Sequence, residues 1–214
     1  WRALRDYPSV FTGVAQFMAL PTDWVSDTYV LPRYDYTDHP NLYNVIVVSN
    51  LDSVDRQFTV TIEGVEMEGS PFTVLASDDT VLKFPGIQGG PVVVSADTGA
   101  RIIASLYELR GSDNWAGWNG QSEMMGIPLD KLSDSYVIPR YYGAVNPTRL
   151  DARIFIANPD SVARSITVKI GGVEMEGSPY TLEPNTGQVL KYAVDGGPVE
   201  IIGPPGSNII ASLS

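Results

Sequence analysis

The sequence predicts an all-β protein made of two tandem β-sandwich domains joined by short structured connectors. Three observations carry this prediction: an internal repeat, short β-branched and aromatic segments, and turn residues between those segments. The repeat is clearest at residues 26–34, SDTYVLPRY, which return 107 residues later as SDSYVIPRY at 133–141. Three further blocks return in the same order: GVEMEGSPF at 64–72 as GVEMEGSPY at 172–180, GGPV at 89–92 as 196–199, and IIASL at 102–106 as 209–213.

The repeat divides the 214-residue chain into halves, which we take as domains of residues 1–107 and 108–214, each with a leading connector. The offset is 107 residues at the first and last blocks and 108 at the block that begins with Gly64. One residue is therefore gained and one lost between the blocks, in turns that absorb such changes. A unit of this length is large enough to bury its own core without a metal or a disulfide.

Short segments rich in β-branched and aromatic residues give the strands of each domain. In the segment 57–63, Phe58, Val60 and Ile62 alternate with polar residues, and the partner segment of the second domain alternates in the same way. Such alternation predicts strands with one buried and one solvated face. In the first domain we expect strands at 28–34, 43–49, 57–63, 65–67, 72–75, 80–84, 91–95 and 101–107.

Turn chemistry separates these segments. Gly, Pro, Asn, Asp and Ser gather at 50–53, 63–64, 68–71, 88–90 and 97–99. Short strands at this spacing, with no helical-length periodic segment among them, favour an immunoglobulin-like sandwich. One or two helical turns are expected at 14–20, inside the first connector.

Composition excludes several classes of function. The chain has no cysteine, a single histidine, His39, and a formal net charge of −11. A surface of this charge repels phosphates and anionic lipids, which argues against nucleic-acid and membrane-surface partners. No apolar run reaches the roughly 18 residues that span a bilayer. Serine elbows and phosphate-binding glycine loops are missing, so we expect no catalytic residues, no metal and no cofactor.

The connectors, at 8–24 and 111–131, are apolar, and we expect them to pack between the domains and to restrict their relative motion. The strand at the end of the chain is expected to join the same contacts, between domains or between subunits. The residues expected to make these contacts are Phe11, Phe17, Met18, Trp115, Trp118, Met124, Met125, Ile209, Ile210 and Leu213.

Acidic side chains give two candidate sites. Glu66 and Glu68, repeated as Glu174 and Glu176, could serve in acid and base chemistry or bind a hard cation, but their presence in both units favours solvated strand residues. A second set could ligate calcium from loops. It consists of Asp35, Asp38 and His39 with the turn Ser77, Asp78 and Asp79, and it is not repeated, which favours simple turn solvation.

Two tryptophans and two arginines leave alternatives open. Trp115 and Trp118, among asparagines, could stack on a sugar ring, or could wedge the connector between the domains, which we favour because large aromatic side chains are costly to expose. Arg33 and Arg140 hold equal places in the repeat. They could contact a partner, although a half-buried pair with a carboxylate is more ordinary.

The motifs at 133–141, 156–160 (IANPD), 168–173 (VKIGGV), 196–201 (GGPVEI) and 208–213 (NIIASL) resemble tandem repeats of bacterial cell-surface and secreted proteins. Glu123 to Pro128, EMMGIP, is similar to the connector of those repeats, whereas residues 16–21, QFMALP, depart from it at the acidic residue and at the glycine. The resemblance covers nearly the whole of each unit. It implies a sandwich module used for architecture or adhesion outside the cell, with no catalytic residues to carry over.

We therefore expect an extracellular or cell-surface structural repeat protein, with a carbohydrate-binding or adhesive module as the alternative. The expected partner is the protein itself, either as adjacent repeats of a longer chain or as a head-to-tail homopolymer, and a glycan is the second candidate. In a polymer, the junction inside the chain would be the template for the junction between chains. Exchange of the strand at 209–213 between chains is a further possibility.

Overall fold

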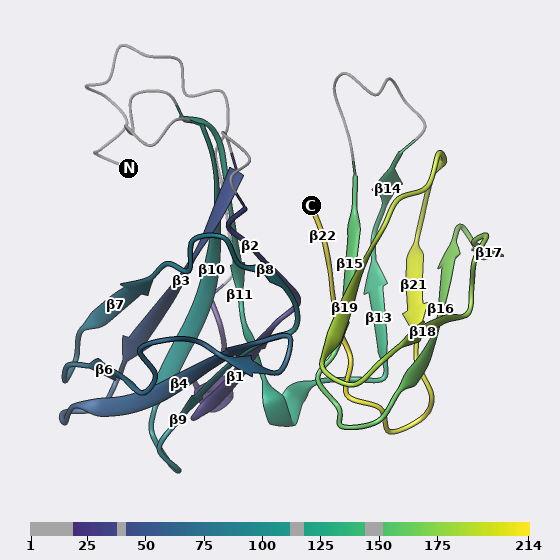
Figure 1. Cartoon of the computed structure of the whole chain (residues 1–214). Coiled ribbons are helices and arrows are strands. Elements are labelled where there is room, and N and C mark those ends of the chain that lie inside the picture. Colours follow the sequence, from purple (N-terminus) through teal and green to yellow (C-terminus); the bar gives the residue numbers. More distant parts are fainter. Residues whose placement is uncertain (1–18, 38–41, 112–117, 144–151) are drawn as a thin grey trace.

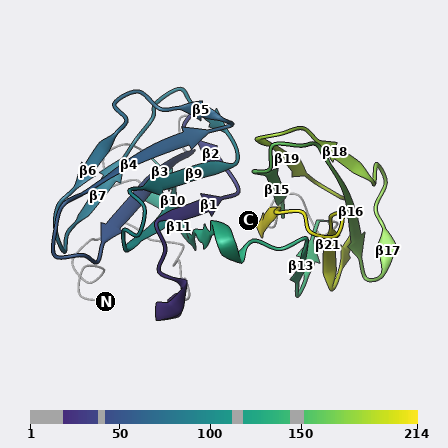
Figure 2. The same ribbon diagram turned by 90° about the horizontal axis from the view of Figure 1, so that it is seen from below.

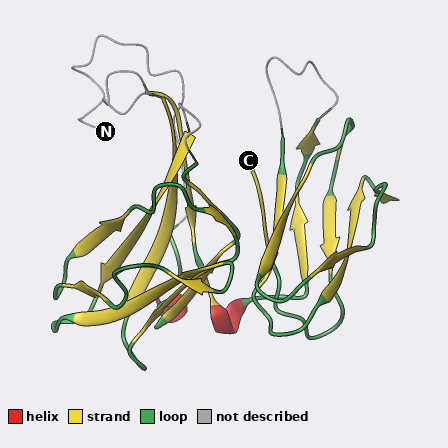
Figure 3. Cartoon of the chain, viewed as in Figure 1, coloured by secondary structure: helices red, strands yellow, loops and turns green. Residues whose placement is uncertain are grey.

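The computed structural model describes residues 19–37, 42–111, 118–143 and 152–214. Within these residues the protein is all-β, as predicted. The regular elements are strands, apart from two single 3-10 turns, η1 (Thr22–Trp24) and η2 (Leu129–Lys131) (Figures 1 and 3). None of the described helices has the length and apolar character needed to cross a bilayer. Of the segment 14–20, where helical turns were expected, residues 14–18 lie outside the described residues, and residues 19 and 20 are not helical.

Two sheets enclose the core of the first repeat. Sheet I has the order β12-β1-β9-β4-β5, with β6 also paired to β4, and sheet II has the order β11-β10-β3-β7. A two-stranded ribbon, β2-β8, lies beside them. The bounds are β1 (Thr28–Leu31), β2 (Tyr34–Asp35), β3 (Leu42–Asn50), β4 (Arg56–Ile62), β5 (Val65–Glu66), β6 (Phe72–Val74), β7 (Asp79–Leu82), β8 (Gln88–Gly89), β9 (Val92–Ala96), β10 (Ile102–Gly111), β11 (Trp118–Met125) and β12 (Ile127–Pro128).

The second repeat has the same order of strands within shorter sheets. Sheet III has the order β13-β21-β16-β17, with β18 also paired to β16, sheet IV has the order β19-β15-β22, and β14 pairs with β20. The bounds are β13 (Ser135–Ile138), β14 (Tyr141–Tyr142), β15 (Ile154–Asn158), β16 (Arg164–Ile170), β17 (Val173–Glu174), β18 (Tyr180–Leu182), β19 (Thr186–Leu190), β20 (Asp195–Gly196), β21 (Val199–Ile202) and β22 (Ile210–Leu213).

Each repeat has its own hydrophobic core. The predicted alternation along β4 is confirmed, because Phe58, Val60 and Ile62 are at most 2% exposed and the polar residues between them are not buried. β16 shows the same pattern. Residues from sheets I and II share one buried cluster, and residues from sheets III and IV share another. The cores are thus closed separately within each repeat.

A buried asparagine at the end of one strand holds the same loop in both repeats. The Nδ2 group of Asn50 donates to the carbonyl oxygens of Val54, Val74 and Leu75 at 2.8 to 3.3 Å. The Nδ2 group of Asn158 bonds the corresponding carbonyl oxygens of the second repeat at 2.9 to 3.1 Å. Both side chains are at most 3% exposed, so these bonds replace water for buried acceptors.

The repeated Gly-Gly-Pro block marks a close approach of two backbone segments. A Cβ atom on Gly90 would lie 2.3 Å from the carbonyl oxygen of Pro32, and one on Gly197 would lie 2.3 Å from that of Pro139. Neither position has space for any other residue. The block is therefore tied to the repeated Pro-Arg-Tyr segment, which runs beside it in each repeat.

The two repeats lie side by side, with η2 at the crossing between them (Figures 1 and 2). The C-terminus, at the end of β22, lies between the two groups of strands in both views. The contact between the two repeats is made by a face of sheet I and a face of sheet IV.

The segment after β10 differs from the expected connector. Residues 118–125 form β11, which pairs with β10 of sheet II, and Ile127–Pro128 forms β12, which pairs with β1 of sheet I. Its glycine and polar residues show no strand periodicity, so the pairing partners, and not local propensity, make it extended. The second leading segment thus completes both sheets of the first repeat.

Candidate functional site: the junction between the two repeats

Two rows of side chains, one from each repeat, meet at the junction. In sheet I, Val30 pairs across the strands with Ile127 on one side and with Val93 on the other. In sheet IV, Ala157 pairs with Ile210. All five residues belong to one apolar cluster, which also includes Leu132.

This cluster is closed to water at its centre. Val30 and Ala157 are fully buried and Ile210 is 2% exposed. Apolar area removed from water in this way stabilises the junction by about 25 cal/mol per Å². The repeats are therefore held together by a packed interface as well as by the covalent connection.

Close backbone contact accompanies the apolar rows. Ala157 also pairs with Gly187 of β19, which extends the sheet IV row. A Cβ atom on Gly187 would lie 3.2 Å from the carbonyl oxygen of Gly90, in the other repeat. A larger residue in place of Gly187 would press against the first repeat.

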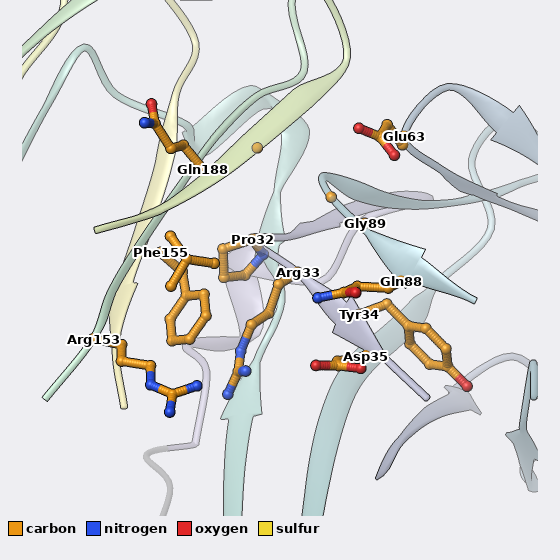
Figure 4. Close-up of a pocket in the computed structure, with 13 residues that line it drawn as sticks. Pro32, Arg33, Tyr34, Asp35, Glu63, Gln88, Gly89, Arg153, Phe155 and Gln188 are labelled. Carbon is orange, nitrogen blue, oxygen red and sulfur yellow. The ribbon is translucent and has the colours of Figure 1, made fainter. Parts of the chain in front are cut away.

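Arg33 connects the two repeats through its charge. It follows β1, and its guanidinium forms an ion pair with Glu108 of β10, whose side chain is only 4% exposed. The same guanidinium lies 3.7 Å from the ring centroid of Phe155 in β15, and Figure 4 shows the two side chains next to each other. A cation over an aromatic ring is stabilised by the ring quadrupole, more so when water is excluded.

A cleft of about 330 Å³ opens beside this contact (Figure 4). It lies between the repeats and has a mixed lining: Phe155, the charged residues Arg33, Asp35, Glu63 and Arg153, and the amides Gln88 and Gln188. Asp35 is held in place, because its backbone N–H donates to Oδ1 of Asn44 at 2.7 Å and its Oδ1 accepts from the Thr37 hydroxyl at 2.8 Å. The cleft is polar enough for a small hydrophilic solute.

A second cavity, of about 90 Å³, is lined by Arg33 and Glu108 together with Glu123 and the residues at 212–214. Burial raises the pKa of Glu123, although hydrogen bonds with Tyr107 and Ser105 act in the opposite direction. Burial, together with the neighbouring Glu123, raises the pKa of Tyr107 to about 12. Tyr107 thus stays a hydrogen-bond donor at neutral pH.

The acidic candidates are dispersed over the surface. Glu66, Glu68, Glu174 and Glu176 are all exposed, next to the half-buried or buried Met175 and Met67. Asp78 and Asp79 are exposed in the turn that leads into β7, whereas Asp38 and His39 lie outside the described residues. Among the residues that the structure describes, no three acidic or histidine side chains are grouped in a way that could hold a metal ion.

The expected contact residues fall into three groups. Ile210 lies in the junction cluster, whereas Ile209 and Leu213 pack in the core of the second repeat. Met124 packs against the core of the first repeat, and Met125 is half-buried. Phe11, Phe17, Met18 and Trp115 lie outside the described residues, and Trp118 begins β11 without a described side chain.

The two arginines have different surroundings. Arg33 has the half-buried carboxylate pairing that sequence reasoning favoured. Arg140, its counterpart, is exposed, and its guanidinium lies 4.5 Å from the ring centroid of Tyr142. The position in the repeat is shared, but only Arg33 lies at the junction.

Sequence reasoning missed the residues at the centre of the junction, namely Val30, Val93, Ile127, Phe155 and Ala157. One signal for them was available. Residues 154–157, IFIA, form a continuous apolar run, which is typical of a strand buried on both faces. β15 is buried at all five positions, because one face meets its own core and the other meets the first repeat.

No protein-family model matches the chain, and no curated protein matches it either.

Proposed function

We propose that this chain is an extracellular structural repeat protein, the building block of a cell-surface array or a head-to-tail filament. In this proposal its two immunoglobulin-like sandwich domains are kept in one relative position, and the product of the fold is a defined spacing. The resemblance of the repeat motifs to those of bacterial surface proteins supports the location outside the cell.

The observation that carries the proposal is the buried junction. A flexible pair of domains needs only a linker, whereas here two apolar rows, an added strand and the stacking of Arg33 on Phe155 join the repeats. Domains of one chain are expected to move relative to each other unless the interface between them is large and apolar. The junction is what a spacer of fixed length requires.

Distance measurements between the repeats test this proposal. The chain has no cysteine, so spin labels can be placed at Val54→Cys and Val162→Cys, two exposed positions of equal rank in the repeats. A single narrow distance distribution is expected. Adding Val30→Asp should broaden it, while Val137→Asp, at an exposed residue, should leave it unchanged. A broad distribution without the Val30 change would contradict a fixed geometry.

The location is tested separately. An antibody raised against this chain should label intact source cells or the material they release, and protease added outside the cells should remove the label. Labelling that requires lysis of the cells would show that the protein is not extracellular.

Carbohydrate binding is the second candidate, and it depends on Trp115 and Trp118. The cleft at the junction offers amide and carboxylate groups to a sugar, but Arg33 covers one face of the Phe155 ring, and Tyr34, which also lines the cleft, is only 1% exposed. Binding to a glycan array that disappears in a Trp115→Ala, Trp118→Ala variant would favour this candidate over a purely structural role.

A further inference from the structure

The same strand has opposite surroundings in the two repeats. β1 and β13 align residue for residue at the 107-residue offset, so that Val30 corresponds to Val137. Val30 is fully buried, whereas Val137 is 69% exposed. β1 pairs on both edges, with β9 and β12, while β13 is the end strand of sheet III, and no described strand pairs with its outer edge. A strand with an open edge and an apolar face is a template for another strand.

The covering strand of the first repeat has a counterpart in the chain. β12, Ile127–Pro128, corresponds to Leu20–Pro21, and η2, which follows β12, corresponds to η1. Leu20 is partly buried and packs against the core of the first repeat. The chain therefore holds both halves of the contact, the open edge at β13 and the covering segment at Leu20–Pro21.

We propose that the outer edge of β13 binds the Leu20–Pro21 segment of a second copy of this chain. The register follows from the internal junction, where Val30 pairs with Ile127 and Tyr29 with Pro128. Val137 of one copy would pair with Leu20 of the next, and Tyr136 with Pro21. Because the two surfaces differ, the contact is heterologous and continues from copy to copy. This inference rests on the proposed structural function and supplies its partner.

The contact between copies is expected to be weaker than the internal junction, because residues at several equivalent positions differ. Ser49, for example, takes the place of Ala157. Glu200 takes the place of Val93 beside the central valine, and Asp79 takes the place of Gly187 in the opposite row. Both are acidic, so they oppose close approach of the two rows. Ala19 takes the place of Gly126, where a Cβ atom would lie 3.0 Å from the carbonyl oxygen of Ala104. Association is expected only at high protein concentration.

Disulfide trapping tests the register. One chain carries Leu20→Cys and a longer, tagged chain carries Val137→Cys, and the two are mixed under mild oxidation. Paired residues of neighbouring strands lie within disulfide range. A mixed dimer is expected from this pair. The matched control is Val162→Cys in the tagged chain, because the corresponding Val54 stays 53% exposed beside the docked second repeat. Equal yields from both mixtures would overturn the proposal.

Association measured by sedimentation velocity gives an independent test. Val137→Asp should weaken association at least about tenfold, while Val162→Asp should not change it. Restoring three residues of the internal junction, with Ala19→Gly, Asp79→Gly and Glu200→Val, should strengthen association at least about tenfold. A restored variant that stays monomeric at millimolar concentration would overturn the proposal.

These outcomes are separate from those of the proposed function. A narrow distance between the two repeats without any trapping at β13 would retain the structural function and remove the second copy as the partner. A broad distance between the repeats would remove the fixed geometry itself, whatever the trapping shows.

Discussion

The guanidinium of Arg33 in the first repeat stacks on the ring of Phe155 in the second, 3.7 Å from the ring centroid. Because Arg33 also forms an ion pair with Glu108, one side chain joins a charged group of its own repeat to an aromatic group of its neighbour. Arg140 holds the same place in the second repeat and stacks on Tyr142, a residue of its own repeat. The repeated arginine has thus been used for two kinds of contact.

Arg33→Met should lower the free energy of unfolding by about 3 kcal/mol, because it breaks a buried ion pair and leaves a buried carboxylate to be accommodated. Urea unfolding at neutral pH measures this change. Arg140→Met, at an exposed arginine, is the control and should cost less than about 0.5 kcal/mol. If the double variant Arg33→Met, Glu108→Leu is no more stable than Arg33→Met alone, the ion pair is not the reason for the loss.

Gly90→Ala and Gly197→Ala should each destabilise the protein by about 3 kcal/mol or more, because the new Cβ atom would meet a backbone carbonyl oxygen at 2.3 Å. Thermal unfolding followed by circular dichroism measures the loss. Gly99→Ala is the control: its φ is +79° but no atom lies within 4 Å of the added Cβ, so about 1 kcal/mol is expected. Equal losses at all three positions would show that crowding is not the cause.

Asn50→Ala and Asn158→Ala should each cost about 2 to 4 kcal/mol, because each leaves buried carbonyl oxygens without the amide donor that serves them. Calorimetry of the two single variants is the measurement. Since the two asparagines hold equivalent loops, the costs should agree within about 1 kcal/mol. A large cost in one repeat and none in the other would contradict the equivalence of the loops.

Acid should destabilise the protein partly through Asp52 and Asp160. A hydrogen bond from the Arg101 N–H, assisted by Arg56, lowers the pKa of Asp52 below its ordinary 3.8. Burial acts to raise the pKa of Asp160, but hydrogen bonds from Asn208 and Arg164 outweigh it, and the pKa is lowered. A pKa that is lower in the folded state contributes stability above the unfolded value, and this contribution is lost as pH falls through the folded value.

Asp52→Asn with Asp160→Asn should therefore reduce stability at neutral pH and flatten its decline below about pH 4. Unfolding midpoints in urea, measured from neutral pH downward, test this. Glu66→Gln with Glu174→Gln, at exposed residues, is the control and should keep the acid dependence of the unmodified chain. An unchanged slope in the aspartate variant would contradict the assignment.

Most strands could be predicted because their signal is local. Alternation along β4 and β16, and glycine or proline at the turns, depend only on neighbouring residues, and the burial of Phe58, Val60 and Ile62 confirms it. β11 and β12 were missed for the opposite reason. Their sequence has little strand propensity, and they become strands by hydrogen bonding to β10 and β1, a pairing that local sequence patterns do not encode.

The junction was harder to predict than the fold. The apolar residues of the connectors led to the prediction that the connectors form the junction. The central contact is instead made by residues of regular strands, such as Val30 and Ala157. The nearly identical sequences around Val30 and Val137 do not distinguish their surroundings, since what differs between the two residues is the neighbour that covers the strand. Among the residues of the junction, Arg33 is the one whose pairing with a carboxylate was predicted from the sequence.

Because β11 and β12 belong to the sheets of the preceding repeat, the unit of the sequence and the unit of folding are out of step. A genetic duplication of one period therefore adds a folded repeat together with the strands, equivalent to β11 and β12, that complete the sheets of the repeat before it. A fragment that ends at the sequence boundary near residue 107 would lack β11 and β12, which complete the sheets of the first repeat. A fragment that ends after Pro128 would retain both strands.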